Sequence, residues 1–262
     1  MKLLLSNDDG VFASGIRALA TELNRHHDIF VSAPDRERSA VSRAMTLNEP
    51  LRAQETHIEG LPEVPAFAVS GTPVDCVRLA LGNLFSALGN LFSAPDIVVS
   101  GINHGGNLGT DVLYSGTVAA AHEAALLGYP AIAISSLSHR GEYLETAARI
   151  AVFAVEYLRN HPLSFGTVLN VNVPAVPYEA LKGVKVTPLA IEEYALEYIE
   201  RKDPFGRTYY WCPRGCTTCS EGMDVDDRWA REGYVTLTPI TYDLTQYSRM
   251  GEMDAHDIRW LG

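Results

Sequence analysis

The sequence predicts an α/β fold with a mainly parallel sheet, and three observations support this. Short apolar runs alternate with amphipathic stretches, which is the pattern of repeated βαβ units. At 262 residues, of which 47% are hydrophobic, the chain is long enough to bury one sizeable core. From about Val184 the pattern changes to strands separated by turn signals. We therefore expect a core over residues 1–183 and a strand-rich C-terminal extension over residues 184–262, both in the same overall domain.

The elements of the core follow from the apolar runs and the amphipathic stretches between them. Strands are expected at Lys2–Ser6, Ile29–Ala33, Phe67–Ser70, Asp96–Ser100, Ala131–Ser135 and Val168–Val173. Helices are expected at Gly15–His26, from Pro73 onward, at Val118–Leu127 and at Tyr143–Arg159.

The helix that starts near Pro73 has a clear beginning and an unusual continuation. Thr72 can cap it, Pro73 suits its first position, and Asp75 completes a capping-box pattern. The heptad Leu81–Ala87 is then repeated without change as Leu88–Ala94. Seven residues make roughly two turns, so a helix could absorb the repeat with a drift of about 20°, whereas its glycines and asparagines favour a loop. We interpret the repeat as a structural insertion without a chemical role.

The extension combines strands with many aromatic residues. Strands are expected at Lys185–Leu189, Thr208–Trp211 and Tyr234–Ile240. The aromatic residues are Tyr194, Tyr198, Phe205, Tyr209, Tyr210 and Trp211. Such a segment more often builds a subunit interface than a catalytic site, so we expect a role in oligomerisation.

Charge and hydropathy exclude several classes of partner. The net charge of −11 disfavours binding to nucleic-acid polymers and to anionic membranes. The apolar run near the N-terminus is too short for a secretory signal, and no run approaches the roughly 20 residues of a membrane span. A cytoplasmic protein is therefore expected. A small phosphorylated substrate stays possible, because a metal ion reverses the local potential.

The four cysteines do not form a complete metal site. Cys76 is expected to pack as a small apolar residue on its helix. Cys212, Cys216 and Cys219 form a C-x3-C-x2-C cluster that lacks a fourth ligand nearby. Free or redox-labile thiols are favoured there over a structural zinc ion.

The most informative segment is Asn7-Asp8-Asp9-Gly10, directly after the first strand. The carboxyl ends of strands are where open α/β sheets bind ligands. Two adjacent carboxylates repel each other there, and burial increases the repulsion. A divalent cation is the simplest counter-charge, although solvated charges in an Asx turn are the alternative.

Two further loops follow strands that are expected at the same sheet edge. Ser39 follows the second strand, where its hydroxyl could complete an oxygen shell or act only in a turn. The segment Ser100–Gly109 contains four glycines after its first serine, so its backbone amides can line a ligand, and Asn103 supplies a carbonyl oxygen suited to a hard cation. It matches neither a Walker nor a dinucleotide fingerprint.

The segment after Tyr114 begins a helix that can bind an anion. Ser115 or Thr117 can cap this helix, whose free N–H groups attract negative charge. His104 could contact substrate, whereas His122 falls inside the helix and is expected to be packed or at the surface.

Together these segments resemble the SurE family, the stationary-phase survival proteins that act as metal-dependent nucleoside monophosphate phosphatases. The matching segments are SNDDG at Ser6–Gly10, APDRERS at Ala33–Ser39, SGTPVDC at Ser70–Cys76, SGINHGGNLG at Ser100–Gly109, YSGTVAAA at Tyr114–Ala121, Pro130–Ser135, Asn170–Pro174 and GYVTLTPI at Gly233–Ile240. The resemblance implies a Rossmann-like three-layer αβα sandwich. It also implies a C-terminal extension that exchanges between subunits of a homodimer or homotetramer.

The resemblance also implies roles for particular residues. The ligands of one divalent cation per subunit, Mn²⁺ or Mg²⁺, would be Asp8, Asp9, Ser39 and Asn103, with Asp8 and Asp9 catalytic. The residues expected to bind substrate phosphate are Asn7, Gly105, Gly106, Asn107, Ser115, Gly116 and Thr117.

The expected activity is hydrolysis of nucleoside 5′- and 3′-monophosphates to the nucleoside and orthophosphate. The attack could come from Asp8 itself or from a water molecule. Hydrolysis of short-chain polyphosphate and metal-dependent nucleotide sensing without catalysis are the alternatives. A haloacid-dehalogenase-type phosphatase is disfavoured, because it requires Asp-x-Asp where the acids here are adjacent.

Overall fold

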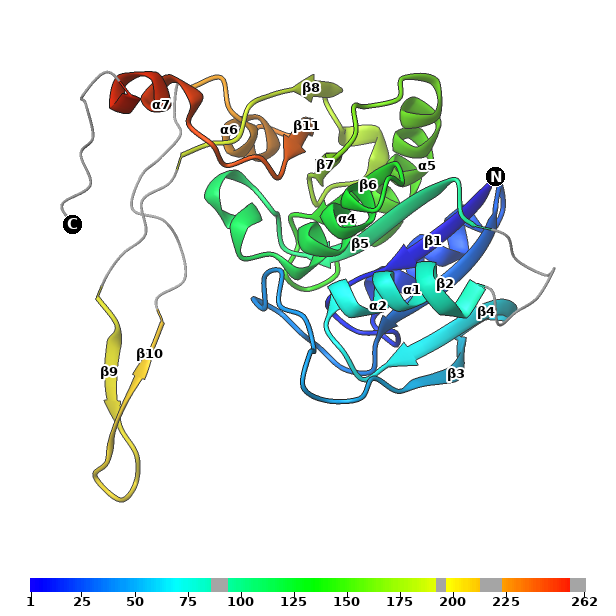
Figure 1. The fold of residues 1–262 in the computed structure, drawn as a ribbon, viewed down its shortest axis with the longest axis horizontal. Coiled ribbons are helices and arrows are strands. Elements are labelled where there is room, and N and C mark those ends of the chain that lie inside the picture. The colour runs from blue at the N-terminus through cyan, green and yellow to red at the C-terminus, as the bar shows by residue number, and fades with distance from the viewer. Residues whose placement is uncertain (86–93, 192–196, 213–222, 255–262) are drawn as a thin grey trace.

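The computed structural model describes residues 1–85, 94–191, 197–212 and 223–254. Its centre is a nine-stranded sheet in the order β3-β4-β2-β1-β5-β6-β7-β11-β8 (Figure 1). The strands are β1 (Lys2–Ser6), β2 (Asp28–Pro34), β3 (Ala53–Ile58), β4 (Leu61–Val69), β5 (Ile97–His104), β6 (Ala131–Ser136), β7 (Thr167–Val173), β8 (Val184–Val186) and β11 (Val235–Thr241). Only the β3–β4 and β7–β11 pairs in this sheet are antiparallel, so the predicted mainly parallel sheet is confirmed.

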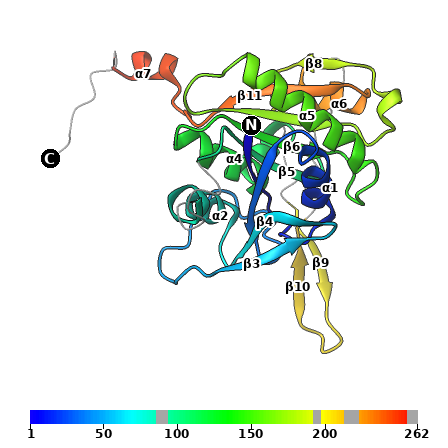
Figure 2. The ribbon, with the colours of Figure 1, turned by 90° about the vertical axis from the view of Figure 1, so that its right-hand side faces the viewer.

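Helices cover both faces of the sheet, which makes the predicted three-layer αβα sandwich (Figure 2). On one face α1 (Ser14–Leu23) and α5 (Leu144–Asn160) pack over Leu3 and Leu5. On the other face α2 (Pro73–Leu79) and α4 (Gly116–Leu126) pack over Leu4. Because alternate side chains of a strand point to opposite faces, the apolar run of β1 supplies both cores.

The six predicted core strands and the four predicted helices are all present, with changed boundaries. β4 starts at Leu61 rather than Phe67, and the edge strand β3 was not predicted. The capping box of α2 is confirmed, because Thr72 Oγ1 accepts from the Asp75 amide and Asp75 Oδ2 accepts from the Thr72 amide.

After α2 the chain continues as a π-helical turn, Ala80–Leu84. Phe85 follows and is buried against Phe30, with ring centroids 4.6 Å apart. Residues 86–93 hold nearly all of the second heptad copy and lie outside the described residues. The choice between helix and loop for this copy therefore stays a prediction.

Part of the extension belongs to the core sheet. β11 pairs with β7, and β8 pairs with β11, so two of its strands complete the same sheet as residues 1–183. The short helix α6 (Asp226–Arg231) precedes β11, and α7 (Tyr247–Asp254) follows it. The strands β9 (Ile199–Lys202) and β10 (Thr208–Trp211) form a separate antiparallel hairpin that stands apart from the main sheet (Figure 1).

The predicted strands of the C-terminal extension are present, and its described aromatic and cysteine residues can be placed. The predicted strand Lys185–Leu189 is shorter, at Val184–Val186, and the aromatic residues of the hairpin, such as Tyr210 and Trp211, are exposed. Cys76 is buried and Cys212 is exposed, whereas Cys216 and Cys219 lie outside the described residues. Tyr194 lies outside them as well. In the part of the chain that the structure describes, no helix is long and apolar enough to cross a membrane.

Candidate active site

A pocket of about 460 Å³ opens at the carboxyl ends of β1, β2 and β5. These three strands are neighbours in the sheet, so the loops that follow them meet there. The lining residues are Asp8, Asp9, Glu37, Ser39, Ala40, Asn103, His104, Gly106, Asn107, Asp111, Tyr114, Ser115 and His139. The structure therefore brings together the four predicted metal ligands from the carboxyl ends of three strands, with Asn103 still inside β5.

The turn after β1 fixes the direction of the two aspartates. Asn7 Nδ2 donates to the Gly10 carbonyl at 2.9 Å, and the Gly10 amide donates to Asn7 Oδ1 at 3.2 Å. Gly10 has a φ of +102°, a conformation that side-chain-bearing residues rarely adopt. Asn7 is completely buried and does not line the pocket, so the structure assigns its amide to the turn rather than to substrate.

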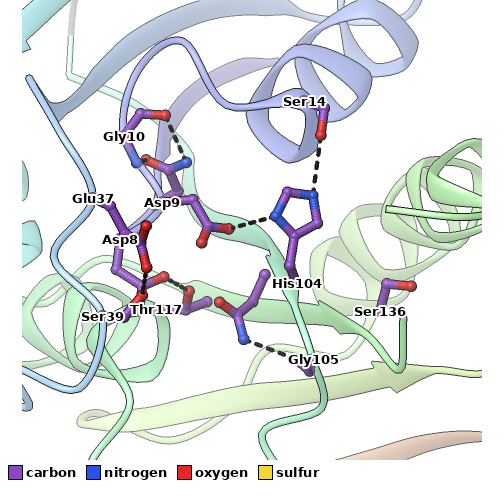
Figure 3. Close-up of polar contacts among 12 residues, drawn as sticks. Asp8, Asp9, Gly10, Ser14, Glu37, Ser39, His104, Gly105, Thr117 and Ser136 are labelled. Atoms are coloured by element: carbon purple, nitrogen blue, oxygen red, sulfur yellow. Dashed lines mark hydrogen bonds and ion pairs between the residues drawn. The ribbon is translucent and has the colours of Figure 1, made fainter. Parts of the chain in front are cut away.

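Asp8 is buried beneath the first turn of α4. Its Oδ1 accepts a hydrogen bond from Thr117 Oγ1 (Figure 3). Burial raises the pKa of Asp8 from 3.8 to about 6, and the neighbouring Asp9 adds to the rise, whereas the Thr117 hydrogen bond opposes it. A Cβ atom at Gly116 would lie 2.7 Å from Asp8 Cβ, so only glycine lets α4 approach this carboxylate. Two of the predicted phosphate-binding residues therefore also hold Asp8.

Asp9 faces a histidine that is itself held in place. His104 Nδ1 lies 3.4 Å from Asp9 Oδ2, and His104 Nε2 lies 3.1 Å from Ser14 Oγ (Figure 3). Burial raises the pKa of Asp9, and His104 opposes the rise. Asp9 Oδ2 is buried, yet it makes no hydrogen bond within the described residues. A buried carboxylate oxygen in this state lacks part of its expected coordination.

Ser39 and Asn103 complete the group of oxygen ligands. Ser39 Oγ donates to Glu37 Oε1 at 2.8 Å, so its lone pairs are available on the other side (Figure 3). Asn103 Nδ2 donates to the Gly105 carbonyl at 2.8 Å, which leaves its oxygen as the atom to offer to a cation.

The donor set fits a hard divalent cation. Two carboxylates, an amide oxygen and a hydroxyl are the ligand types of Mg²⁺ and Mn²⁺. A bound cation would coordinate the buried Asp9 oxygen that has no hydrogen bond and would offset the burial that raises the pKa of both aspartates. No group of three or more His, Cys, Asp or Glu side chains within the described residues is arranged to hold a metal. The candidate site instead uses two such side chains together with Ser39 and Asn103.

The glycine-rich loop is held rigidly beside this site. The Asn107 amide donates to Asn172 Oδ1 at 2.8 Å, and its carbonyl accepts from Asn170 Nδ2 at 2.9 Å and from Asn172 Nδ2 at 3.0 Å. The Asn107 side chain donates to Ser135 Oγ at 2.7 Å. The backbone amide of Asn107 and one N–H of its side chain are thus already used, so its predicted contact with phosphate falls to the second side-chain N–H, beside the backbone amide of Gly106.

The wall opposite the glycine-rich loop begins α4. Ser115 Oγ accepts from the Val118 amide at 3.1 Å, so Ser115 is the N-cap. The free N–H groups of this first turn and the helix dipole favour an anion at this point. His122 was expected to be packed or at the surface, and the structure shows that it is packed. His122 is buried, and Arg43 lies 2.9 Å from its Nδ1.

Several residues of the site were not predicted from the sequence. Glu37, Asp111, Tyr114 and His139 line the pocket, and Ser14 reaches it only through His104. Glu37 lies in the segment Ala33–Ser39 and Tyr114 begins the segment Tyr114–Ala121, so proximity to predicted site residues was the available signal for both. Asp111 lies between two such segments and in neither. No pattern pointed to His139, whose ring would lie 2.5 Å from a Cβ atom at Gly105.

Comparison with known proteins identifies the family to which the chain belongs. The family described as survival protein SurE matches residues 3–196. This protein belongs to the SurE family. The 5′-nucleotidase SurE of Synechococcus elongatus is 47% identical over 263 residues, covering 97% of this chain and 98% of the relative. The 5′-nucleotidase SurE of Methylococcus capsulatus is 44% identical and covers 100% and 98%. The crystal structure of the SurE protein from Aquifex aeolicus aligns with a TM-score of 0.83 at 35% identity, covering 98% of this chain and 100% of that one.

Proposed function

We propose that this SurE protein is a divalent-metal-dependent phosphatase that hydrolyses nucleoside 5′- and 3′-monophosphates to the nucleoside and orthophosphate. The observation that carries the proposal is the pair of buried Asp8 and half-buried Asp9 at the end of β1, in one pocket with Ser39 and Asn103. The names of the relatives support it, because both curated sequences are called 5′-nucleotidase.

The charge of the pocket supports a metal requirement. Its described lining contains Asp8, Asp9, Glu37 and Asp111 but neither lysine nor arginine. A phosphate dianion would be repelled by such a lining without a bound cation. We assign the cation to Asp8, Asp9, Ser39 and Asn103, one Mn²⁺ or Mg²⁺ per subunit. When bound, it would supply the positive charge that offsets the charge of the phosphoryl group.

The other residues of the site hold the ligands and the phosphate. Thr117 fixes Asp8 through its hydrogen bond. His104, which Ser14 contacts on its other ring nitrogen, fixes the orientation of Asp9. The Gly106 amide of the glycine-rich loop and the N–H groups of the first turn of α4 would bind the phosphoryl oxygens that do not face the cation. Holding the phosphate from two sides prepares it for in-line attack.

The attacking group is Asp8 or a water molecule held beside it. Asp8 attack would form an aspartyl phosphate that water then cleaves, whereas direct attack by water would release orthophosphate in one step. Hydrolysis of a 5′-AMP analogue whose phosphoryl group is made chiral with sulfur and oxygen isotopes separates the two. Retained configuration at phosphorus means two successive displacements and supports the covalent route, whereas inverted configuration means one displacement by water and rules this route out.

The proposed activity is tested by phosphate release from 5′-AMP, 3′-AMP and tripolyphosphate. The protein is first treated with EDTA and then supplied with Mn²⁺ or Mg²⁺. We expect faster release from the monophosphates than from tripolyphosphate, and none before metal is restored. Full activity in EDTA would remove the metal from the proposal, and metal-dependent nucleotide binding without phosphate release would favour a sensor.

A matched pair of variants locates the activity. Asp9→Asn should lower kcat by roughly a hundredfold or more, because it removes a charged ligand of the cation. Asp35→Asn is the control. Asp35 follows β2 as Asp9 follows β1, but it is exposed and does not line the pocket. Equal activity of the two variants would contradict the assignment.

A further inference from the structure

A buried aspartate outside the pocket, Asp226, lies at the start of α6. Asp226 is completely buried, although it belongs to the C-terminal extension and follows Gly109 by 117 residues. Within the described part of the chain, none of the hydrogen bonds of its carboxylate is to a proposed metal ligand. A buried carboxylate is costly unless its oxygens are well hydrogen-bonded, so its partners show what it contributes.

Asp226 binds three backbone amides from three separate segments. Its Oδ2 accepts from the Gly109 amide at 2.9 Å. Its Oδ1 accepts from the Ala190 amide at 2.8 Å and from the Asp227 amide at 2.9 Å. The Asp226 amide donates in turn to the Pro188 carbonyl at 3.0 Å. One carboxylate therefore joins the glycine-rich loop, the segment after β8 and the first turn of α6.

The bond to Gly109 falls at a critical point of the pocket wall. Gly109 ends the glycine-rich loop and begins the 3₁₀ helix Gly109–Leu113, which leads to Tyr114 and Ser115. Both of these residues line the pocket. Asn107 is already held from the side of β7, so Asp226 holds the other end of the same loop. Together the two attachments leave the loop little freedom to move relative to α4.

The electrostatics of Asp226 agree with an acceptor role. Burial raises its pKa, whereas the amides of Gly109, Ala190 and Asp227 lower it. The N–H groups thus favour the charged form, which can accept from all of them at once.

We propose that Asp226 is a positioning residue for the phosphate-binding wall, and that it acts through the Gly109 amide. This inference rests on the proposed phosphatase function of the pocket. Through this hydrogen bond, the C-terminal extension is attached to the loop that would hold the phosphoryl group. The same extension carries the exposed β9–β10 hairpin.

The test uses Asp226→Asn in the full-length protein. The asparagine is similar in size, but its NH₂ group would face at least one backbone N–H where an oxygen accepted before. We expect the KM for 5′-AMP and the inhibition constant of orthophosphate to rise roughly tenfold or more, because the loop amides lose their alignment. The affinity for Mn²⁺, measured by calorimetry without nucleotide, should stay within about twofold, since no proposed ligand is moved.

Asp227→Asn is the matched control. Asp227 is the next residue and is also buried, but its carboxylate pairs with Arg231 at 2.7 Å on the same helix. This variant should leave both constants within about twofold. If Asp226→Asn binds orthophosphate like the wild type, or if its phosphate and Mn²⁺ affinities fall together, the positioning role is wrong.

A measurement on the wild type covers the case in which Asp226→Asn does not fold. Hydrogen exchange should show the Gly109 amide protected in the absence of orthophosphate, as expected for a buried bond to a carboxylate. Exchange at the rate of an open loop would overturn the inference. A wild type that neither hydrolyses nucleotides nor binds orthophosphate would refute the proposed function instead, and the exchange measurement would still decide whether Asp226 holds the loop.

Discussion

Asp8→Asn is expected to make the metal-free protein more stable at neutral pH while it removes activity. Burial raises the pKa of Asp8 from 3.8 to about 6 in the folded protein. A raised folded-state pKa means that folding favours the protonated carboxyl. The stabilising effect of that proton is therefore complete below pH 3.8 and is lost as the pH rises through about 6.

The size of the effect follows from the two pKa values. Their difference of roughly two units, at about 1.4 kcal/mol per unit, corresponds to about 3 kcal/mol at pH 7.5. Asparagine is neutral and nearly the same size, and its Oδ1 can still accept from Thr117 Oγ1. The variant should therefore recover most of this free energy in the absence of metal.

The assay is urea unfolding in EDTA, followed by tryptophan fluorescence and far-ultraviolet circular dichroism. At pH 7.5 the free energy of unfolding of Asp8→Asn should exceed that of the wild type by up to about 3 kcal/mol. At pH 5, one unit below the folded-state pKa of Asp8, the wild type has regained about 1 kcal/mol and the difference shrinks accordingly. Saturating Mn²⁺ should stabilise the wild type much more than the variant.

Asp35→Asn again serves as the control, because this exposed carboxylate should give nearly the same stability as the wild type at both pH values. The reasoning is refuted if Asp8→Asn is less stable than the wild type at pH 7.5 in EDTA. It is also refuted if the difference does not change between pH 5 and pH 7.5.

Three further predictions follow from single contacts. Burial and Arg43 lower the pKa of His122 from 6.5 to about 4, so the neutral form is favoured by folding. The contribution of His122 to the stability of the wild type should fall by about 3 kcal/mol as the pH falls through this range, so the Tm of the wild type should drop relative to that of His122→Gln between pH 7 and pH 4.5. Gly116→Ala places a Cβ atom 2.7 Å from Asp8 Cβ and should weaken Mn²⁺ binding roughly tenfold in calorimetry while the circular dichroism spectrum is retained. Thr72→Ala removes the N-cap of α2 and should lower the free energy of unfolding by about 1 kcal/mol in urea.

The parts of the fold that the sequence predicted best are those with strong local signals. Leu3, Leu4 and Leu5 form a run that is apolar on both faces, as a central parallel strand requires. β3 has the opposite character, because only Ile58 among its six residues is buried. Its pairing depends on the neighbouring strand β4 rather than on its own sequence, so no local pattern revealed it.

The residues of the candidate site likewise fall into those with a local sequence signal and those whose role depends on distant contacts. Asp8 and Asp9 could be nominated because each acid follows a buried strand within a few residues. Asn170 and Asn172 lie inside the apolar run of β7, where a sequence pattern reads them as strand positions. Their role depends on the contact with Asn107, more than 60 residues earlier in the chain. Contacts of this separation leave no trace in the spacing of a single sequence.

The position of the pocket follows from the strand order, which the periodicity could not supply. From β1 the chain builds the sheet outward through β2 to β4 and β3, then returns to the other side of β1 and continues through β5, β6 and β7. The connections on the two sides of β1 therefore diverge, and the loops after β1, β2 and β5 leave a crevice between them. Asp9 follows β1, Ser39 follows β2, and Asn103 lies at the carboxyl end of β5. Because β2 and β5 lie on opposite sides of β1, the site can form only when both halves of the sheet have assembled around β1.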